Sequence, residues 1–302
     1  MRHGLGVQLT AKETGEAVRR ALAEDLGDGD VTTRAVVPAG AKARAHVVAR
    51  EPLVVAGLAF AQAAFRALSP RVRLHRQVAD GDHVRGGEIL LTVAGFARAL
   101  LSAERVALNF LQRLSGVATL TARYVAAIAG TRARILDTRK TTPGWRRFEK
   151  YAVACGGGTN HRFGLFDQVL IKDNHLAALG AGHGDPVAVA VQRARTAWPR
   201  LKLEIEADTL AQVRQAAAAG ADVILLDNMS LALLRQAVAL VRGRALTEAS
   251  GGVNLETVRR IAKTGVDYIS VGALTHSAPA VDIALDFEPA TPAAPSRGGR
   301  KP

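Results

Sequence analysis

Apolar residues are spaced differently in the two halves of the chain. From Thr10 they recur at helical intervals to about Gly27, and Glu13 is placed to complete a capping box with Thr10. This spacing predicts an N-terminal helix. Alternating polar and apolar residues then predict strands, with turn-forming residues between them, over residues 42–50, 71–78 and 88–93.

A long helix is predicted to join the two halves. Apolar positions recur at helical spacing over residues 102–127, and Ser102 is the expected N-cap. Beyond this helix, strand patterns alternate with helix patterns, and the last four strand ends fall about 21 to 24 residues apart, as in successive parallel strand and helix units. The expected strands are 133–137, 169–172, 202–206, 223–227, 245–249 and 268–272.

Charged residues or glycines stand at the carboxyl end of each expected strand of this second half. In a parallel barrel all these ends face one mouth, where loops present functional groups. We therefore predict an α/β barrel of about six strands, fewer than the usual eight, whose open side another element or subunit covers. The predicted domains are an α+β open sandwich over 1–116, completed by 276–287, a barrel over 117–275 and a disordered tail over 288–302.

Composition limits the class of protein. The chain is 48% hydrophobic but only 4% aromatic, which predicts a core of Ala, Val, Leu and Ile. Its longest apolar stretch, about 53–65, is shorter than the ~18 residues of a membrane span, and the N-terminus lacks a signal pattern. The single cysteine, Cys155, excludes an internal disulfide. We expect a cytoplasmic protein without a membrane partner.

The net charge of +13 raises the possibility of nucleic-acid binding. The arginines, however, are spread through expected helices such as 187–198 and are not interleaved with aromatic residues. We therefore expect no nucleic-acid partner, and a basic binding barrel for nucleotides or nucleic acid stays as the non-enzymatic alternative.

Cationic side chains are dense in the segment 135–175. Planar guanidinium groups match carboxylates or phosphates with two hydrogen bonds, and loops after rigid strands are where such ligands are held. The segment therefore predicts a pocket for a small polyanion. Its cationic candidates are Arg139, Lys140, His161, Arg162 and Lys172.

Two acids, Glu206 and Asp227, end neighbouring strands beside this cationic pocket. Such carboxylates hold sugar hydroxyls, or a hydrated Mg²⁺ that bridges to phosphate oxygens. Glu204, two residues before Glu206, is expected either to share its strand face as a weaker candidate of the same kind or to face a helix and pair with an arginine.

Glycine-rich loops follow the last two expected strands. Backbone amides at such loops bind phosphate, and in barrels the last two strands commonly supply them. Gly156, Gly157 and Gly158 are expected to allow a close backbone approach where a helix ends, and Cys155 is expected to be buried rather than nucleophilic. The predicted phosphate loops are Ser250-Gly251-Gly252 and Val271-Gly272-Ala273.

Nine motifs in order resemble the quinolinate phosphoribosyltransferase family, a group of type II phosphoribosyltransferases, over about residues 10–287. They are EDLGDGDVTT, LLSAERVALNFLQRLSGVAT, DTRKT, GGGTNHR, LIKDNH, LEIEAD, ILLDN, EASGG and ISVGALTHS. The resemblance implies a pentosyltransferase that joins quinolinate to phosphoribosyl pyrophosphate (PRPP). The implied products are nicotinate mononucleotide, pyrophosphate and CO₂, in de novo NAD biosynthesis, with Mg²⁺ as cofactor.

The resemblance also implies roles for individual residues. Lys140, Lys172, Glu206 and Asp227 are the implied catalytic residues, and Glu206 and Asp227 also hold Mg²⁺, partly through PRPP and water. The implied quinolinate ligands are Arg105, Arg139, His161, Arg162 and Lys172. The implied PRPP ligands are Thr138, Lys140, Glu206, Asp227, Ser250, Gly251, Gly252, Val271, Gly272 and Ala273.

Arg105 resembles the arginine that this family supplies to the neighbouring subunit's site. A homodimer, possibly further assembled, is therefore the implied active unit. A related transferase that uses nicotinate or another ring remains the enzymatic alternative, although five cationic groups favour a dianion. The roles of Arg146 and Arg147 are left open by the sequence.

Overall fold

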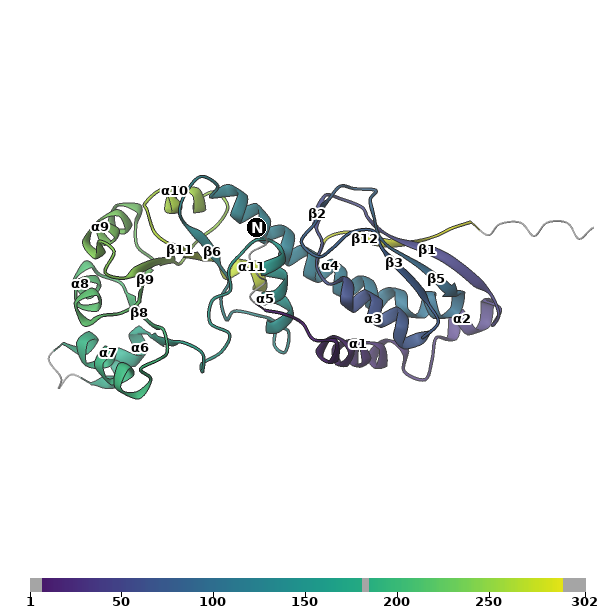
Figure 1. Ribbon diagram of the computed structural model, residues 1–302, viewed down its shortest axis with the longest axis horizontal. Helices are drawn as coiled ribbons and strands as arrows, with labels where there is room; N and C mark the ends of the chain where they lie inside the picture. Colours follow the sequence, from purple (N-terminus) through teal and green to yellow (C-terminus); the bar gives the residue numbers. More distant parts are fainter. Residues whose placement is uncertain (1–6, 181–184, 290–302) are drawn as a thin grey trace, which may run out of the picture.

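A long helix joins two lobes in the computed structural model (Figure 1), which describes residues 7–180 and 185–289 of the chain. The N-terminal lobe holds a four-stranded sheet in the order β12-β1-β5-β3, in which neighbouring strands are antiparallel. Its elements are α1 (Ala11–Leu26), α2 (Val31–Val36), β1 (Lys42–Ala49), β2 (Leu53–Val54), α3 (Leu58–Leu68), β3 (Arg73–Arg76), β4 (His83–Val84), β5 (Ile89–Phe96) and β12 (Ile283–Phe287).

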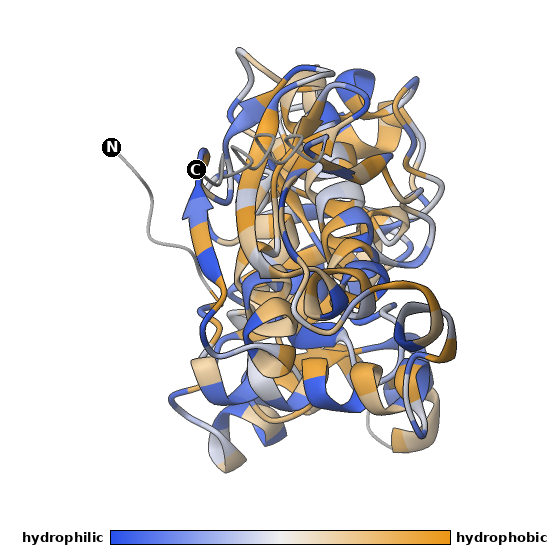
Figure 2. Cartoon of the chain, turned by 90° about the vertical axis from the view of Figure 1, so that its right-hand side faces the viewer, coloured by the Kyte–Doolittle hydropathy of each residue, from blue (hydrophilic) through white to orange (hydrophobic). Residues whose placement is uncertain are grey.

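The expected N-terminal helix is confirmed as α1. The Thr10 hydroxyl accepts a hydrogen bond from the Glu13 amide at 3.2 Å, and the Glu13 carboxylate accepts one from the Thr10 amide at 3.0 Å. The helix ends at Gly27 and buries Val18 and Leu22. Figure 2, which views this lobe end on, shows hydrophobic and hydrophilic segments alternating along its helices and strands, as half-buried elements require.

The connecting helix α4 (Ala97–Ala127) is longer than the sequence predicted, and the N-cap prediction was wrong. Phe96 occupies the N-cap position because the chain passes directly from β5 into the helix. Ser102 lies inside the first turns, where its hydroxyl donates a 2.8 Å hydrogen bond to Asp30. The helix also passes through the predicted boundary at residues 116–117, so the two lobes share one rigid element.

Six parallel strands form the second lobe, in the order β6-β11-β10-β9-β8-β7. Each predicted strand is present within two residues of its predicted ends. Among the described residues β6 and β7 do not pair with each other, so the barrel is open between them, as predicted. The strands are β6 (Arg134–Leu136), β7 (Val169–Ile171), β8 (Leu203–Ala207), β9 (Val223–Asp227), β10 (Leu246–Ser250) and β11 (Tyr268–Ser270).

Helices cover the outside of this curved sheet (Figure 1). Within the described residues, no helix is long and apolar enough to cross a membrane. The helices of this lobe are α5 (Arg146–Cys155), α6 (Asp173–Leu179), α7 (Pro186–Ala197), α8 (Leu210–Ala219), α9 (Leu231–Val241), α10 (Val258–Ala262) and α11 (Ala273–His276).

Aromatic stacking locks the two lobes together. Phe60 of α3 stacks on Phe110 of α4 with 4.7 Å between ring centroids, and Phe110 stacks on Trp145 at 5.1 Å. Beyond α11 the chain crosses α4 so closely that a Cβ on Gly116 would lie 2.0 Å from the Pro279 carbonyl oxygen. The chain then adds β12 to the N-terminal sheet. The predicted tail falls mostly on residues 290–302, which lie outside the described part.

Candidate active site

The carboxyl ends of the six strands surround a cavity of about 780 Å³. Every site residue predicted within 117–275 lines it. Strand ends of a parallel barrel converge in this way because all the strands run in one direction. The lining residues are Thr138, Arg139, Lys140, His161, Arg162, Leu170, Lys172, Glu206, Leu225, Asp227, Asn228, Glu248, Ser250, Gly251, Gly252, Val253, Ser270, Val271, Gly272, Ala273 and His276.

Two arginines, the buried Arg162 and the half-buried Arg139, give the cavity a cationic wall. Arg162 is buried and donates a 3.4 Å hydrogen bond to the Gln168 carbonyl. Burial and the nearby charge of Arg139 lower the pKa of Arg162, but a guanidinium remains charged in proteins. The Arg139 Nε is buried without a hydrogen-bond partner in the described part of the chain. This wall therefore presents cationic donors to an anionic ligand.

A buried ion pair fixes the segment that carries His161 and Arg162. Asp137 follows β6, and its carboxylate accepts hydrogen bonds from Lys150 Nζ at 2.5 Å and from the His161 amide at 2.8 Å. Asn160 donates to the other Asp137 oxygen at 2.7 Å. Asp137, which the sequence suggested only as a charged strand end, is fully buried and therefore structural.

The triple glycine before this segment allows the predicted close approach. A Cβ on Gly156 would lie 2.3 Å from the Ala118 carbonyl oxygen of α4, and Gly157 has a positive φ of 83°. Cys155 is buried, and burial raises the pKa of its thiol to about 12. The predicted burial of Cys155 is therefore confirmed, and a thiol with a raised pKa is protonated at neutral pH.

A second buried carboxylate, Glu149, holds the loop that carries Arg139 and Lys140. Glu149 accepts hydrogen bonds from Arg113 Nη2 at 2.8 Å, from the Thr142 amide at 3.0 Å and from the Thr142 hydroxyl at 2.8 Å. Thr275 donates to the Lys140 carbonyl at 2.7 Å. The loop after β6 is thus tied to α4, α5 and α11, which makes the cavity wall rigid.

Arg146 and Arg147, whose roles the sequence left open, stabilise the fold. Arg146 donates hydrogen bonds of 3.1 Å to the Thr141 hydroxyl and to the Phe163 carbonyl, so it joins the two loops that bear the cationic wall. Arg147 pairs with Glu13 at 2.6 Å and therefore fastens α5 to α1.

The acidic side of the cavity is more open. Lys172 Nζ lies 3.7 Å from Glu206 Oε2, and the Glu206 side chain is 13% exposed. Burial raises the pKa of Glu206, Lys172 acts against this rise and Asp227 adds to it. Carboxylate oxygens of Glu206, Asp208 and Asp227 lie within 4.8 Å of one another, so they match Mg²⁺ in donor type. Asp208 was not among the predicted site residues, although LEIEAD contains it.

Glycines shape the remaining wall. Gly251 and Gly252 have positive φ angles of 93° and 59°, and a Cβ on Gly251 would lie 2.0 Å from Asn228 Oδ1. A Cβ on Gly272 would lie 3.0 Å from Lys140 Cδ. These glycines keep backbone close to the acidic and cationic side chains. Asn228, Ser270 and His276 also line the cavity and were not predicted, although His276 stands in the quoted ISVGALTHS.

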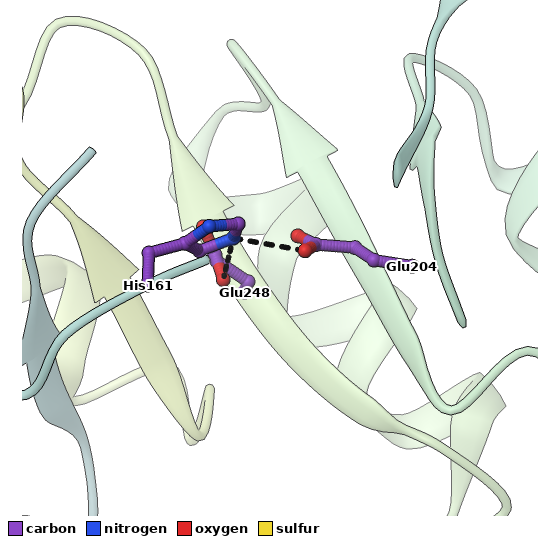
Figure 3. Close-up of side chains that lie close together, drawn as sticks. All are labelled: His161, Glu204 and Glu248. Atoms are coloured by element: carbon purple, nitrogen blue, oxygen red, sulfur yellow. Dashed lines mark hydrogen bonds and ion pairs between the residues drawn. The ribbon is translucent and has the colours of Figure 1, made fainter. Parts of the chain in front are cut away.

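In the cavity wall, His161 meets two carboxylates that are almost fully buried, Glu204 and Glu248 (Figure 3). Its Nε2 lies 2.9 Å from Glu204 Oε2 and 3.6 Å from Glu248 Oε2. The alternative in which Glu204 faces a helix and pairs with an arginine was wrong. Glu204 faces the barrel interior, as Glu206 does, because the two are separated by two residues on β8.

Protonation is linked in this group. Burial alone lowers the pKa of His161, but the hydrogen bond to Glu204 and the charges of Glu248 and Glu204 outweigh burial, so its pKa is raised. Burial and the charge of Glu204 raise the pKa of Glu248 to about 8. At neutral pH, the imidazole is therefore biased towards its charged form and Glu248 towards its neutral form.

Arg105 does not line this cavity in the described part of its own chain. It lies on α4 in the N-terminal lobe, with its side chain exposed. Its predicted role at the site of a neighbouring subunit stays a prediction.

Residues 117–286 match the family model described as the C-terminal domain of quinolinate phosphoribosyl transferase, and residues 30–115 match the N-terminal domain of the same family. The chain belongs to the quinolinate phosphoribosyltransferase family. The family predicted from the motifs is therefore confirmed. The cavity falls within the C-terminal match and Arg105 within the N-terminal one.

Proteins of known sequence or structure are similar to this chain over nearly its whole length. It is 46% identical to the nicotinate-nucleotide pyrophosphorylase (carboxylating) of Mycobacterium leprae, covering 90% of this chain and 96% of that relative. It is 44% identical to the probable nicotinate-nucleotide pyrophosphorylase of Bacillus subtilis, covering 87% and 89%. The structure of the nicotinate-nucleotide pyrophosphorylase from Francisella tularensis matches with a TM-score of 0.88 at 37% identity, covering 93% and 98%, and the predicted fold class is confirmed.

Proposed function

We propose that this chain transfers the phosphoribosyl group of PRPP to the ring nitrogen of quinolinate and releases CO₂, giving nicotinate mononucleotide and pyrophosphate for NAD biosynthesis. One observation carries the proposal. A single cavity has a cationic wall on one side and an open acidic and glycine-rich wall on the other. A dicarboxylate and a sugar pyrophosphate need these two environments side by side.

The cationic wall is assigned to quinolinate. Arg139 and Arg162 offer guanidinium donors, and each charge-assisted hydrogen bond contributes about 1.5 to 3 kcal/mol. His161 and Lys172 also line the cavity, and Lys172 is placed where this wall meets the acidic side, 3.7 Å from Glu206. Two adjacent ring carboxylates match this number of cations better than the single carboxylate of nicotinate, so quinolinate is the preferred pyridine.

The opposite wall is assigned to PRPP. Lys140, whose amide donates a 3.0 Å hydrogen bond to the Thr138 hydroxyl, lies beside Gly272, and the backbone of Ser250, Gly251 and Gly252 is open to a phosphate group. Val271 and Ala273 complete this surface. Glu206 and Asp227 would bind the ribose hydroxyls and, with Asp208, hold Mg²⁺.

Catalysis on this arrangement depends on positioning. Bound Mg²⁺ would supply charge neutralisation for the departing pyrophosphate. The cationic wall holds the ring so that its nitrogen faces the ribose, and Glu206 and Asp227 place acidic groups near the positive charge that develops on the sugar. No covalent protein nucleophile is needed. Once the nitrogen carries the ribose, its positive charge stabilises the carbanion left when the neighbouring 2-carboxylate departs as CO₂.

A homodimer belongs to the same proposal. The barrel is open between β6 and β7, and Arg105 is exposed on the N-terminal lobe, away from the cavity of its own chain. We infer that Arg105 reaches the quinolinate pocket of the partner subunit. Larger assemblies of dimers are compatible with this geometry. We also propose a cytoplasmic location, in keeping with one free, buried cysteine.

The direct test is an assay of purified enzyme with quinolinate, PRPP and Mg²⁺. We expect equal amounts of nicotinate mononucleotide and CO₂, little turnover when nicotinate replaces quinolinate, and loss of turnover with a chelator. Faster turnover of nicotinate would overturn the substrate assignment. Absence of turnover with both pyridines, combined with tight, salt-sensitive binding of DNA or RNA, would favour a basic binding barrel.

A further inference from the structure

His161, Glu204 and Glu248 form a buried group in the cavity wall. We name Glu204 and Glu248 the inner carboxylates. We propose that they are positioning residues, which hold the His161 ring through Nε2 so that Nδ1 presents a hydrogen-bond donor to a carboxylate of the pyridine substrate. This inference rests on the proposed function and extends it from the residues that contact substrate to those behind them.

Three separate parts of the chain build this arrangement. Glu204 comes from β8, Glu248 from β10 and His161 from the segment that the Asp137–Lys150 pair fixes, and both carboxylates point at one imidazole edge (Figure 3). The side chains of Glu204 and Glu248 are 0% and 2% exposed, and that of His161 is 9% exposed. The imidazole is therefore held from below, and it also lines the main cavity.

Hydrogen-bond directions decide which ring nitrogen is available. Gln168 Nε2 donates to Glu204 Oε2 at 2.7 Å, so this oxygen is already an acceptor. His161 Nε2 lies 2.9 Å from the same oxygen, which can only accept, so Nε2 carries a hydrogen and donates it. Among the described residues Nδ1 takes part in no hydrogen bond. A neutral ring with its proton on Nε2 would offer the substrate carboxylate only a lone pair, whereas the imidazolium offers a second N–H.

The surrounding charges show why His161 needs carboxylates. Cations gather around it: Lys150 on α5, Arg139 and Arg162 on the cavity wall, and Lys172 and Lys202 at strand ends. Lys150 and burial both lower the pKa of His161. Without the inner carboxylates, the ring would lose its proton in this cationic surrounding. Glu204, joined by Glu248 as that carboxyl ionises towards pH 8, thus keeps a charged donor available beside the arginines.

A purely structural role does not explain the group well. Glu204 Oε1 and Glu248 Oε1 are buried and have no hydrogen-bond partner within the described residues. Such atoms carry a desolvation cost, and apolar side chains of similar size would pack a barrel interior at least as stably. The acids are therefore better explained by their effect on His161 than by stability of the barrel.

Glu248→Gln is the main test, because glutamine keeps the size and shape of the side chain and removes its charge. We expect the KM for quinolinate to rise about tenfold or more near pH 8, where Glu248 is charged in a large share of the wild type, but less than about threefold near pH 6, where Glu248 is already neutral and its replacement removes no charge. The KM for PRPP should stay within about twofold. Glu204→Gln should act in the same direction, and Glu256→Gln, an exposed surface change, should have no effect.

A second readout does not depend on turnover. In ¹³C-histidine-labelled protein, the His161 resonance is assigned by its loss in His161→Ala, and its pKa is measured by NMR. We expect a lower His161 pKa in both inner-carboxylate variants. An unchanged pKa, or equal changes in both KM values at every pH, would overturn the positioning role even in an active enzyme. If the wild type itself turns over no pyridine, the proposed function fails, while the titration still decides whether the acids hold the proton.

Discussion

Glu204 and Glu206 lie two residues apart on one strand and face the same barrel interior, yet their surroundings differ. Glu206 shares an open rim with Asp208 and Asp227, and the carboxylate oxygens of these three lie within 4.8 Å of one another, as the ligand atoms of His161, Glu204 and Glu248 also do. Glu204 is fully buried behind the cavity wall and bonds His161, whereas the almost fully buried Glu248 and His161 themselves line the cavity. The position of each acid along β8 thus decides its role. Glu206, near the cavity mouth, would bind a metal and ribose, whereas Glu204, deeper in the barrel, holds a protein side chain.

Removal of a rim acid should have the largest effect. In Asp227→Asn one charge that faces the sugar and Mg²⁺ is lost, so we expect kcat/KM to fall on the order of a thousandfold. The Mg²⁺ concentration needed for half-maximal rate should also rise. Rates measured over a series of Mg²⁺ concentrations check both effects. An unchanged Mg²⁺ requirement would show that the rim acids do not hold the ion.

Replacement of an arginine in the cationic wall should have the second largest effect. Arg162→Ala should cost about 2 to 5 kcal/mol in transition-state binding, because a desolvated carboxylate loses its partner. Arg139→Ala should behave alike, and Arg193→Ala, an exposed change on α7, serves as the control. Steady-state kinetics with quinolinate give the measurement. A kcat/KM within about fivefold of wild type, equivalent to roughly 1 kcal/mol, argues against carboxylate binding by these residues.

Sharing of the site between subunits predicts complementation. An Arg105→Ala subunit and a Lys140→Ala subunit should each be inactive alone. Mixed dimers should regain activity, because one of their two sites then has both residues intact. At equal mixing we expect about a quarter of wild-type activity, since about half of the dimers are mixed. Mixtures with no activity above the parents would count against Arg105 acting in the partner subunit.

Replacement of an inner carboxylate should have the smallest effect of these changes. The effect predicted here is on the pH dependence of the free energy of unfolding. The folded-state pKa of Glu248 is raised from 4.5 to about 8, so the native state binds more protons than the unfolded chain in this range, and stability falls as pH rises. His161, whose pKa is raised above 6.5, loses its stabilising contribution as pH rises through its folded-state pKa. Both contributions therefore make the wild type less stable at the alkaline end.

Glu248→Gln removes the carboxyl that binds this proton. We expect the stability of the variant relative to wild type to improve by about 1 kcal/mol or more between about pH 5 and pH 8. Urea unfolding at a series of pH values checks this change. Parallel curves for the two proteins would mean that Glu248 titrates normally, and Glu256→Gln should give such parallel curves.

Sequence alone predicted the strands and most of the rim. Side chains alternate along a strand, and strand ends of parallel units converge, so residues such as Lys172 and Asp227 could be placed without coordinates. The inner group could not be predicted, because the partner of Glu204 lies 43 residues earlier, in an irregular segment. The roles of Arg146 and Ser102 depend equally on tertiary contacts with loops, which periodicity does not describe.

The structure of the enzyme with quinolinate and a non-reactive PRPP analogue, in the presence of Mg²⁺, tests the division between rim and interior most directly. We predict ring carboxylates at Arg139 and Arg162, one of them accepting a hydrogen bond from His161 Nδ1, and Mg²⁺ near Glu206 and Asp227. A pyridine bound away from the arginines, or a cation bound between Glu204 and Glu248 with His161 turned out of the cavity, would contradict the account.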